Sequence, residues 1–297
     1  MYASFETSSR GAPTFGVRDV EGETIATIPA GTRAPPFVPR LELTRLGDGA
    51  SVAIIRPRNF DRGRVYPVID NVYGGPWSKQ VRADAYQYFE QQWLADAVDA
   101  IVVLIDARGT PLRDRAWQRA FYRHYGDVPV DGHADAIAAL ARRYPEMDAN
   151  RVGVYGWSNG GYVAAMATLR RPEVFKVGVS GAPVADLRDY DAIMEPFFGP
   201  LSGPDWDQAS LLTWAARPPT RDRPARPLLL IHGTADDNVY FAHALKLAAA
   251  MSLAGRPVEF VPLIDQTHMV TESRAASALS LRMAAHLRTH LHGSPCR

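Results

Sequence analysis

The sequence predicts an α/β fold, in which a mostly parallel, twisted sheet is covered by helices on both faces. From about residue 65 onward, short apolar runs that resemble strands alternate with longer amphipathic stretches that resemble helices, an order that favours a parallel sheet. The apolar runs are rich in Val, Ile and Leu and lack a polar residue at every second position. Such runs are typical of strands buried on both faces. A chain of 297 residues can form one large domain of this kind.

The elements follow in order along the chain. Strands are expected at residues 67–72, 100–105, 151–155, 176–180, 228–232 and 258–263. Helices are expected at residues 83–97, 132–144, 160–169, 241–253 and 273–292. The connection 181–227 is long and rich in Pro, Trp and Phe, so we expect it to line or cover a functional region.

The beginning of the chain follows a different pattern. Residues 15–20 and 24–28 are expected to be strands around a Glu-Gly turn, and a Pro-rich stretch follows them. Residues 41–46 and 52–56 alternate around Gly47-Asp48-Gly49, which is typical of a hairpin. We therefore expect a short β-rich N-terminal segment (1–40), an α/β domain (41–292) and a tail (293–297).

Composition excludes several classes of function. Lys and Arg number 33 against 32 Asp and Glu, so the net charge of +1 does not favour nucleic acid or an anionic membrane as a partner. No apolar run is long enough to cross a bilayer. The single cysteine, Cys296, and the scattered histidines form no metal-ligand pattern, so we expect no metal and no cofactor. No signal peptide is visible at the start, which predicts a cytoplasmic chain, or an exported one if the sequence is a fragment of a longer precursor.

One serine lies among glycines between a predicted strand and a predicted helix. The segment Gly156-Trp157-Ser158-Asn159-Gly160 fits the pattern G-x-S-x-G of a nucleophile elbow. That turn is so tight that side chains two positions before and after the serine would clash, which explains both glycines. The segment predicts an α/β-hydrolase fold with Ser158 as nucleophile, against the alternative of a glycine-rich turn with a passive serine.

A serine nucleophile needs a base and a carboxylate, which follow it in the order Ser, Asp, His in this fold. Asp236 and Asp237 both lie after the strand expected at 228–232, and His268 follows the strand expected at 258–263. Asp237 could instead cap the next helix. His232 ends a strand, where a structural role is expected.

Several motifs together resemble the prolyl oligopeptidase family of serine peptidases, in its dipeptidyl-peptidase branch. The resemblance covers about residues 41–291, and its motifs are NVYGGPWSKQ, DARGT, GWSNGGY, HGTADDNV and THMV. It implies that Ser158 attacks the substrate carbonyl, His268 carries the proton and Asp236, rather than Asp237, orients the imidazole. It also implies an oxyanion hole made by the Asn159 backbone N–H and the Tyr73 hydroxyl.

The resemblance also implies a substrate pocket, and here the sequence departs from the family. Leu187 stands where relatives often carry Trp, Ile193 or Met194 where they carry a second Tyr, and Asn159 where an aromatic residue usually follows the serine. We therefore expect a wider pocket that suits a flat proline ring less well. Its other expected residues are Tyr190, Val184, Val239 and, for the substrate's backbone carbonyl, Asn238.

The expected function is hydrolysis of peptide bonds through an acyl-enzyme, with Pro or Ala before the bond as the residues that the resemblance implies. One alternative is a carboxylesterase or acyl-peptide hydrolase acting on small acyl substrates with the same triad. The other is a truncated, non-catalytic remnant that acts as a binding module. The family's β-propeller does not fit within 297 residues, so segment 1–40 is interpreted as a remnant of one. A homodimer is a further expectation from the resemblance.

Overall fold

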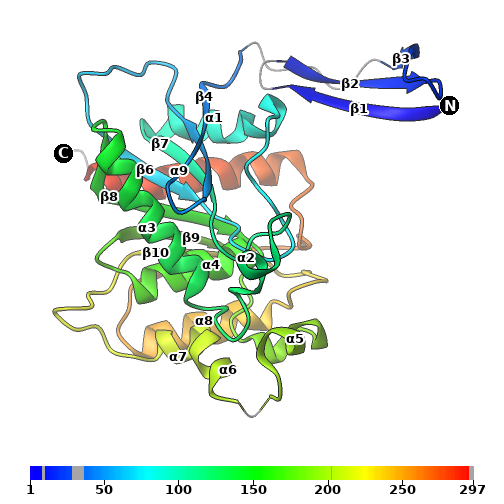
Figure 1. The fold of residues 1–297 in the computed structure, drawn as a ribbon. Helices are drawn as coiled ribbons and strands as arrows, with labels where there is room; N and C mark the ends of the chain where they lie inside the picture. Colours follow the sequence, from blue (N-terminus) through cyan, green and yellow to red (C-terminus); the bar gives the residue numbers. More distant parts are fainter. Residues whose placement is uncertain (9–10, 29–36, 202, 294–297) are drawn as a thin grey trace.

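An eight-stranded, mostly parallel sheet runs through the centre of the molecule (Figure 1). The computed structural model describes residues 1–8, 11–28, 37–201 and 203–293. In sheet order the strands are β11 (Val258–Leu263), β10 (Leu228–Gly233), β9 (Phe175–Gly181), β8 (Met147–Trp157), β6 (Tyr66–Asn71), β7 (Ile101–Asp106), β5 (Ser51–Ile55) and β4 (Leu41–Arg45). Only the pairs of β5 with β4 and with β7 are antiparallel in this sheet. The carboxyl ends of β6, β8, β9, β10 and β11 therefore meet at one edge.

Helices cover both faces of the sheet (Figure 1). Two helices pack on one face: α1 (Phe89–Val98) and α9 (Ser273–His292). Three pack on the other face: α3 (Val128–Arg143), α4 (Asn159–Arg170) and α8 (Ala242–Leu253). The predicted fold class, an α/β-hydrolase fold with helices on both faces of a mostly parallel sheet, is confirmed.

Successive residues of the strands serve two different cores. In β10, Leu228 and Leu230 belong to the core under α3, α4 and α8, whereas Leu229 and Ile231 belong to the core under α1 and α9. All four are essentially inaccessible to solvent. Both faces must therefore be apolar, which is why these strands have no polar alternation in the sequence.

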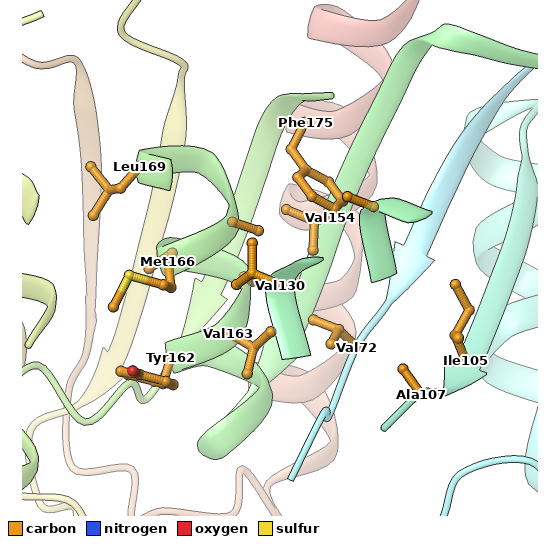
Figure 2. Packing of buried hydrophobic residues seen from close by; sticks show 14 of the residues in the cluster. Val72, Ile105, Ala107, Val130, Val154, Tyr162, Val163, Met166, Leu169 and Phe175 are labelled. Atoms are coloured by element: carbon orange, nitrogen blue, oxygen red, sulfur yellow. The ribbon is translucent and has the colours of Figure 1, made fainter. Parts of the chain in front are cut away.

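The core beneath α4 fixes that helix on the sheet. Figure 2 shows Val163 and Met166 of α4 in the same cluster as Val130 of α3, Val154 of β8 and Phe175 of β9. All five side chains are at most 1% exposed. Large-to-small substitutions in such a core usually cost about 2–5 kcal/mol of stability. This packing therefore strongly stabilises the position of α4 on the strands.

Several predicted boundaries differ from the structure. The helix expected at 83–97 is a 3-10 turn, η1 (Ala85–Tyr88), followed by α1, and the side chain of Asp84 caps that turn. Strand β8 begins at Met147, four residues before the predicted start at 151. Its first four residues, MDAN, form no apolar run and were not predicted as strand, but Met147 and Asp148 pair with the beginning of β6.

The long connection contains short helices that the sequence analysis did not predict, because each is too short to display a helical period. They are η2 (Leu187–Asp189), η3 (Ala192–Met194), α5 (Glu195–Phe198), α6 (Pro204–Ala209) and α7 (Leu211–Ala215). A further short helix, α2 (Arg115–Arg119), lies between β7 and α3. Both 3-10 turns line a cavity beside Ser158, which agrees with the role expected of this connection.

The N-terminal segment forms a separate antiparallel sheet at one end of the molecule (Figure 1). Its strands are β1 (Tyr2–Ser8), β2 (Gly11–Arg18) and β3 (Thr24–Ile28). β2 and β3 overlap the strands predicted at residues 15–20 and 24–28, whereas β1 was not predicted. The rings of Phe5 and Phe15 pack across β1 and β2 with centroids 4.8 Å apart. Most of the Pro-rich stretch and Cys296 of the predicted tail lie outside the described residues.

Candidate active site

Ser158 occupies a sharp turn between the end of β8 and the start of α4. Its backbone has φ +59° and ψ −121°, a conformation that a non-glycine residue adopts only under strain. The Ser158 N–H donates to the carbonyl of Gly181 in β9 (2.8 Å). This bond and the core under α4 hold the strained turn at the carboxyl edge of the sheet.

The glycines on either side of Ser158 are required by close backbone contact. A Cβ on Gly156 would collide with the backbone of Gly160 and with the carbonyl of Val72. A Cβ on Gly160 would collide with the same Val72 carbonyl. The steric reason given for G-x-S-x-G therefore holds, and it includes β6, since Val72 directly follows that strand.

Asp236 and His268 meet at the same edge of the sheet. They lie on the loops after β10 and β11, and Nδ1 of His268 is 2.8 Å from Oδ2 of Asp236. The Asp236 side chain is fully buried and that of His268 is 11% exposed. A carboxylate only accepts hydrogen bonds, so Nδ1 carries the proton of the neutral ring and Nε2 remains a free base.

Four donors of the described residues face the carboxylate of Asp236, and three of them form hydrogen bonds of 3.0 Å or less. Its Oδ1 accepts from the backbone N–H groups of Asn238 (3.0 Å) and Val239 (2.8 Å). Its Oδ2 faces His268 and also Nε2 of His232, at 3.2 Å. Asp236 thus has one fixed orientation, with the oxygen that faces His268 held from a second side.

His232 also lies beside the carboxylate of Asp236, a position that was not predicted from the sequence. Its ring is fully buried, and Nε2 lies 2.7 Å from the carbonyl of Val239 as well as near Asp236. Both neighbours are acceptors, so Nε2 must carry the proton. Burial lowers the pKa of His232, which keeps the ring neutral. The only indication of this position in the sequence was that His232 ends the strand expected at 228–232, just before the loop that carries Asp236.

The backbone of His268 is tied to the nucleophile elbow. The indole N–H of Trp157, next to Ser158, donates to the carbonyl of His268 (2.9 Å). No direct hydrogen bond joins the Ser158 hydroxyl to the imidazole among the described residues. Such catalytic contacts are often long before substrate binds. The three side chains therefore share one edge of the sheet, and only the Asp–His contact is formed.

Tyr73 follows β6 and is held through its backbone. Its N–H donates to Oε1 of Gln80 (2.9 Å), and its carbonyl accepts from Nδ2 of Asn159 (2.7 Å). Burial, together with the nearby Tyr190, raises the pKa of Tyr73, so its hydroxyl stays protonated and can donate. Asn159 is the first residue of α4, where a backbone N–H has no acceptor within the helix.

The side chain of Asn159 bonds at both ends within the protein. In addition to its bond with Tyr73, its Oδ1 accepts from the hydroxyl of Tyr125. Tyr125 is 1% exposed and packs against the rings of Tyr162 and Phe198. Tyr125 lies 34 residues before Asn159, and no motif in the sequence indicated it.

A cavity of about 230 Å³ opens beside Ser158. Its lining contains Ser158 and ten further described residues: Tyr73, Trp77, Tyr125, Asn159, Val184, Leu187, Tyr190, Ile193, Met194 and Asn238. The Tyr190 hydroxyl donates to Oδ1 of Asn238 (2.9 Å). All the residues predicted for the pocket except Val239 line this cavity, and Val239 instead contacts the acid and His232 through its backbone.

The remaining candidates lie elsewhere or act differently. Asp237 does not cap the following helix, because α8 begins at Ala242 and its N-cap residue is Phe241. His133, which precedes the serine in the sequence, is buried against Asp70 at 2.7 Å. In the described ranges no cluster of three potential metal ligands occurs. No helix in the same ranges is both long and apolar enough to span a bilayer.

The sequence is similar to a known family of proteins over most of its length. The sequence profile described as "Prolyl oligopeptidase family" matches residues 85–294. Human dipeptidyl peptidase 8 is 31% identical over 243 residues, which cover 80% of this chain and 27% of that protein. Human prolyl endopeptidase FAP is 34% identical over 246 residues, covering 80% of this chain and 30% of that protein.

The crystal structure of Porphyromonas gingivalis dipeptidyl peptidase 4 has the same fold. Its TM-score is 0.84 at 28% identity, and the match covers 98% of this chain and 42% of that chain. The chain thus spans less than a third of the length of the two human relatives.

Proposed function

Because the chain belongs to the prolyl oligopeptidase family, we propose that it is a serine peptidase that hydrolyses peptide bonds through an acyl-enzyme. One observation carries the proposal: a serine in a strained elbow and a buried Asp–His pair lie at the same edge of the sheet. The relatives named dipeptidyl peptidase and prolyl endopeptidase support a peptide substrate.

The proposed reaction begins when Oγ of Ser158 attacks the substrate carbonyl carbon. Nε2 of His268 accepts the hydroxyl proton, and Asp236 holds the ring in the required tautomer and stabilises its positive charge. The imidazolium then protonates the leaving amine, the C–N bond breaks, and an ester remains on Ser158. Water, activated by the same imidazole, hydrolyses that ester and regenerates the enzyme.

The oxyanion formed in each step needs donors. We assign them to the Asn159 backbone N–H, which the start of α4 leaves without a partner in the helix, and to the Tyr73 hydroxyl. The raised pKa of Tyr73 favours this assignment, since only a protonated phenol donates. Donors of this kind are worth roughly 10²–10³-fold in kcat.

Two other functions share the same residues. A carboxylesterase or acyl-peptide hydrolase would use the same triad on small acyl groups, which the cavity of about 230 Å³ also admits. A non-catalytic binding module would leave Ser158 unreactive. The strain retained at Ser158 and the paired Asp236 and His268 favour an active site over such a remnant.

The first experiment asks whether Ser158 reacts at all. We expect a fluorophosphonate probe to label the wild-type protein and to leave Ser158→Ala unlabelled. Ser158→Ala should lower kcat by at least about 10⁴-fold while its thermal unfolding midpoint stays unchanged. Activity of the variant close to that of the wild type would refute the assignment, and an unlabelled, folded wild type would support the binding module.

A second measurement separates peptidase from esterase. The kcat/KM for Ala-Pro, Ala-Ala and Ala-Leu arylamides is compared with that for a short acyl ester whose leaving group has a similar size. Arylamide hydrolysis that depends on Ser158 supports the peptidase. Hydrolysis of the ester alone would make the carboxylesterase the correct function.

A further inference from the structure

We propose that the cavity beside Ser158 is a binding site for a large apolar side chain, of the size of leucine, methionine or phenylalanine, on the acyl side of the cleaved bond. The proposal rests on the proposed function and names the substrate residue that the same site would take. The cavity is lined by Tyr125, Leu187 and Met194 and by the rings of Tyr73, Trp77 and Tyr190.

Volume is the first argument. The cavity measures about 230 Å³, whereas an apolar protein cavity of about 150 Å³ is already large enough to bind benzene. A phenyl ring or a branched four-carbon chain therefore fits. An alanine methyl group or the ring of proline would enter but leave much of the space unfilled, and unfilled apolar space forfeits dispersion contacts.

The chemistry of the walls is the second argument. Val184, Leu187 and Met194 are each at most 5% exposed and present aliphatic groups to the cavity. Trp77 and Tyr125 add aromatic surface, with ring centroids 6.4 Å apart. No charged side chain occurs among the described residues that line the cavity. Such a surface attracts apolar groups and offers no partner to a charged one.

Several polar groups in the walls are already paired with one another, which is the third argument. The amide of Asn159 is bonded to the carbonyl of Tyr73 and to the hydroxyl of Tyr125. The hydroxyl of Tyr190 donates to Asn238 (2.9 Å). A polar substrate side chain could bond to these paired groups only by displacing their present partners, which costs binding energy. An apolar side chain leaves these bonds intact, so the paired groups favour it over a polar one.

Met194 makes the preference broad within the apolar class. It is 1% exposed and stands on η3, which begins after Asp191 caps the turn. A methionine side chain is unbranched and adapts its shape to irregular neighbours. We therefore expect leucine, methionine and phenylalanine to be accepted together.

The test uses arylamide substrates of the form Ala-Xaa, with free and with acetylated amino ends, where Xaa is Ala, Pro, Leu, Met or Phe. In the wild type, kcat/KM for Leu, Met and Phe should exceed that for Ala by at least about tenfold, since one methylene alone is worth about 10–200-fold in an apolar pocket. A wild type that prefers Pro or Ala overturns the inference without any variant.

Leu187→Trp fills the cavity and tests the location of the site. It should lower the ratio of kcat/KM for Leu over Ala by at least about tenfold. The matched control is Leu281→Trp, which makes the same change at a residue of α9 that is 64% exposed, and it should leave this ratio unchanged. A ratio that Leu187→Trp does not alter places the side chain elsewhere and overturns the inference.

Fluorophosphonate titration of each protein separates a wrong pocket assignment from a wrong proposed function. A wild type that labels but shows no preference for large apolar residues contradicts the pocket assignment and leaves the serine hydrolase intact. A folded wild type that does not label contradicts the proposed function itself.

Discussion

At the scale of single residues, the orientation of Asp236 depends on more than its contact with His268. Two backbone N–H groups hold Oδ1, while His268 and His232 both face Oδ2. His232 is neutral because burial lowers its pKa, so it contributes a hydrogen bond and no charge. It is a positioning residue: it acts on the substrate only through Asp236 and His268.

Replacing His232 by leucine should therefore slow catalysis. His232→Leu removes the second donor from Oδ2 of Asp236, and we expect kcat to fall about tenfold with little change in KM, since a hydrogen bond to a charged group is worth about 1.5–3 kcal/mol. His232→Gln offers a side-chain N–H in the same direction and should recover much of the loss. The measurement is kcat per active site counted by fluorophosphonate.

A purely structural role for His232 predicts a different pattern. The unfolding midpoint of His232→Leu would then fall while kcat per labelled site stayed equal to that of the wild type, and His232→Gln would give no recovery of rate. That combination would contradict the positioning role.

At the scale of elements, the elbow depends on three backbones in close contact. The end of β8, the start of α4 and the residue after β6 meet at Gly156, Gly160 and Val72. The carbonyl oxygen of Val72 lies 2.5 Å from where a Cβ on Gly156 would be and 2.2 Å from where one on Gly160 would be. Backbone atoms cannot move aside as a flexible side chain can, so the strands and the helix would have to separate.

Gly160→Ala should consequently be among the most damaging small substitutions in the chain. We expect it to lower the free energy of unfolding by about 3 kcal/mol or more, or to prevent folding. Gly47→Ala is the matched control: Gly47 lies in the β4–β5 turn, and a Cβ there would meet nothing within 4 Å among the described residues. It should change the free energy of unfolding by less than about 1 kcal/mol. Equal stability of the two variants in denaturant unfolding would contradict this account of the elbow.

At the scale of the whole molecule, buried histidines couple stability to pH. Burial, reinforced by the neighbouring His290, lowers the pKa of His286 from 6.5 to about 4, although Glu259 lies 3.3 Å away and opposes the shift. Burial also lowers the pKa of His243. In each case the folded protein holds the neutral ring. The stability that these two neutral histidines contribute is complete above about pH 6.5. It is lost as the pH falls, because the unfolded chain binds protons at a higher pH than the folded protein does.

We expect the free energy of unfolding to decrease between pH 7 and pH 4, with His286 alone accounting for about 2–3 kcal/mol. His286→Gln should make this decrease shallower. His124→Gln, at a histidine whose side chain is 61% exposed, is the control and should not change the slope. Denaturant unfolding at several pH values measures how the free energy of unfolding depends on pH. If His286→Gln leaves that dependence unaltered, protonation of His286 is not its cause.

Much of the fold and of the site could be predicted because the signals are local. The uninterrupted apolar runs predicted the buried strands, since each strand serves two cores. The glycines around Ser158 predicted the elbow, because a steric requirement within five residues is visible in those residues. The order of loops along the chain then brought Asp236 and His268 to the same edge.

The residue pattern is sufficient to predict the fold class, the elbow and the two loops that carry its partners, whereas the way individual side chains meet there depends on the three-dimensional packing. It puts the imidazole on Asp236 and not on Asp237, and it brings His232 to the same carboxylate. It also joins Tyr125 to Asn159 and leaves an apolar cavity beside the serine. Separation along the chain explains the difference: the Trp157–His268 bond spans 111 residues, and such a contact depends on how the elements pack rather than on any pattern within them.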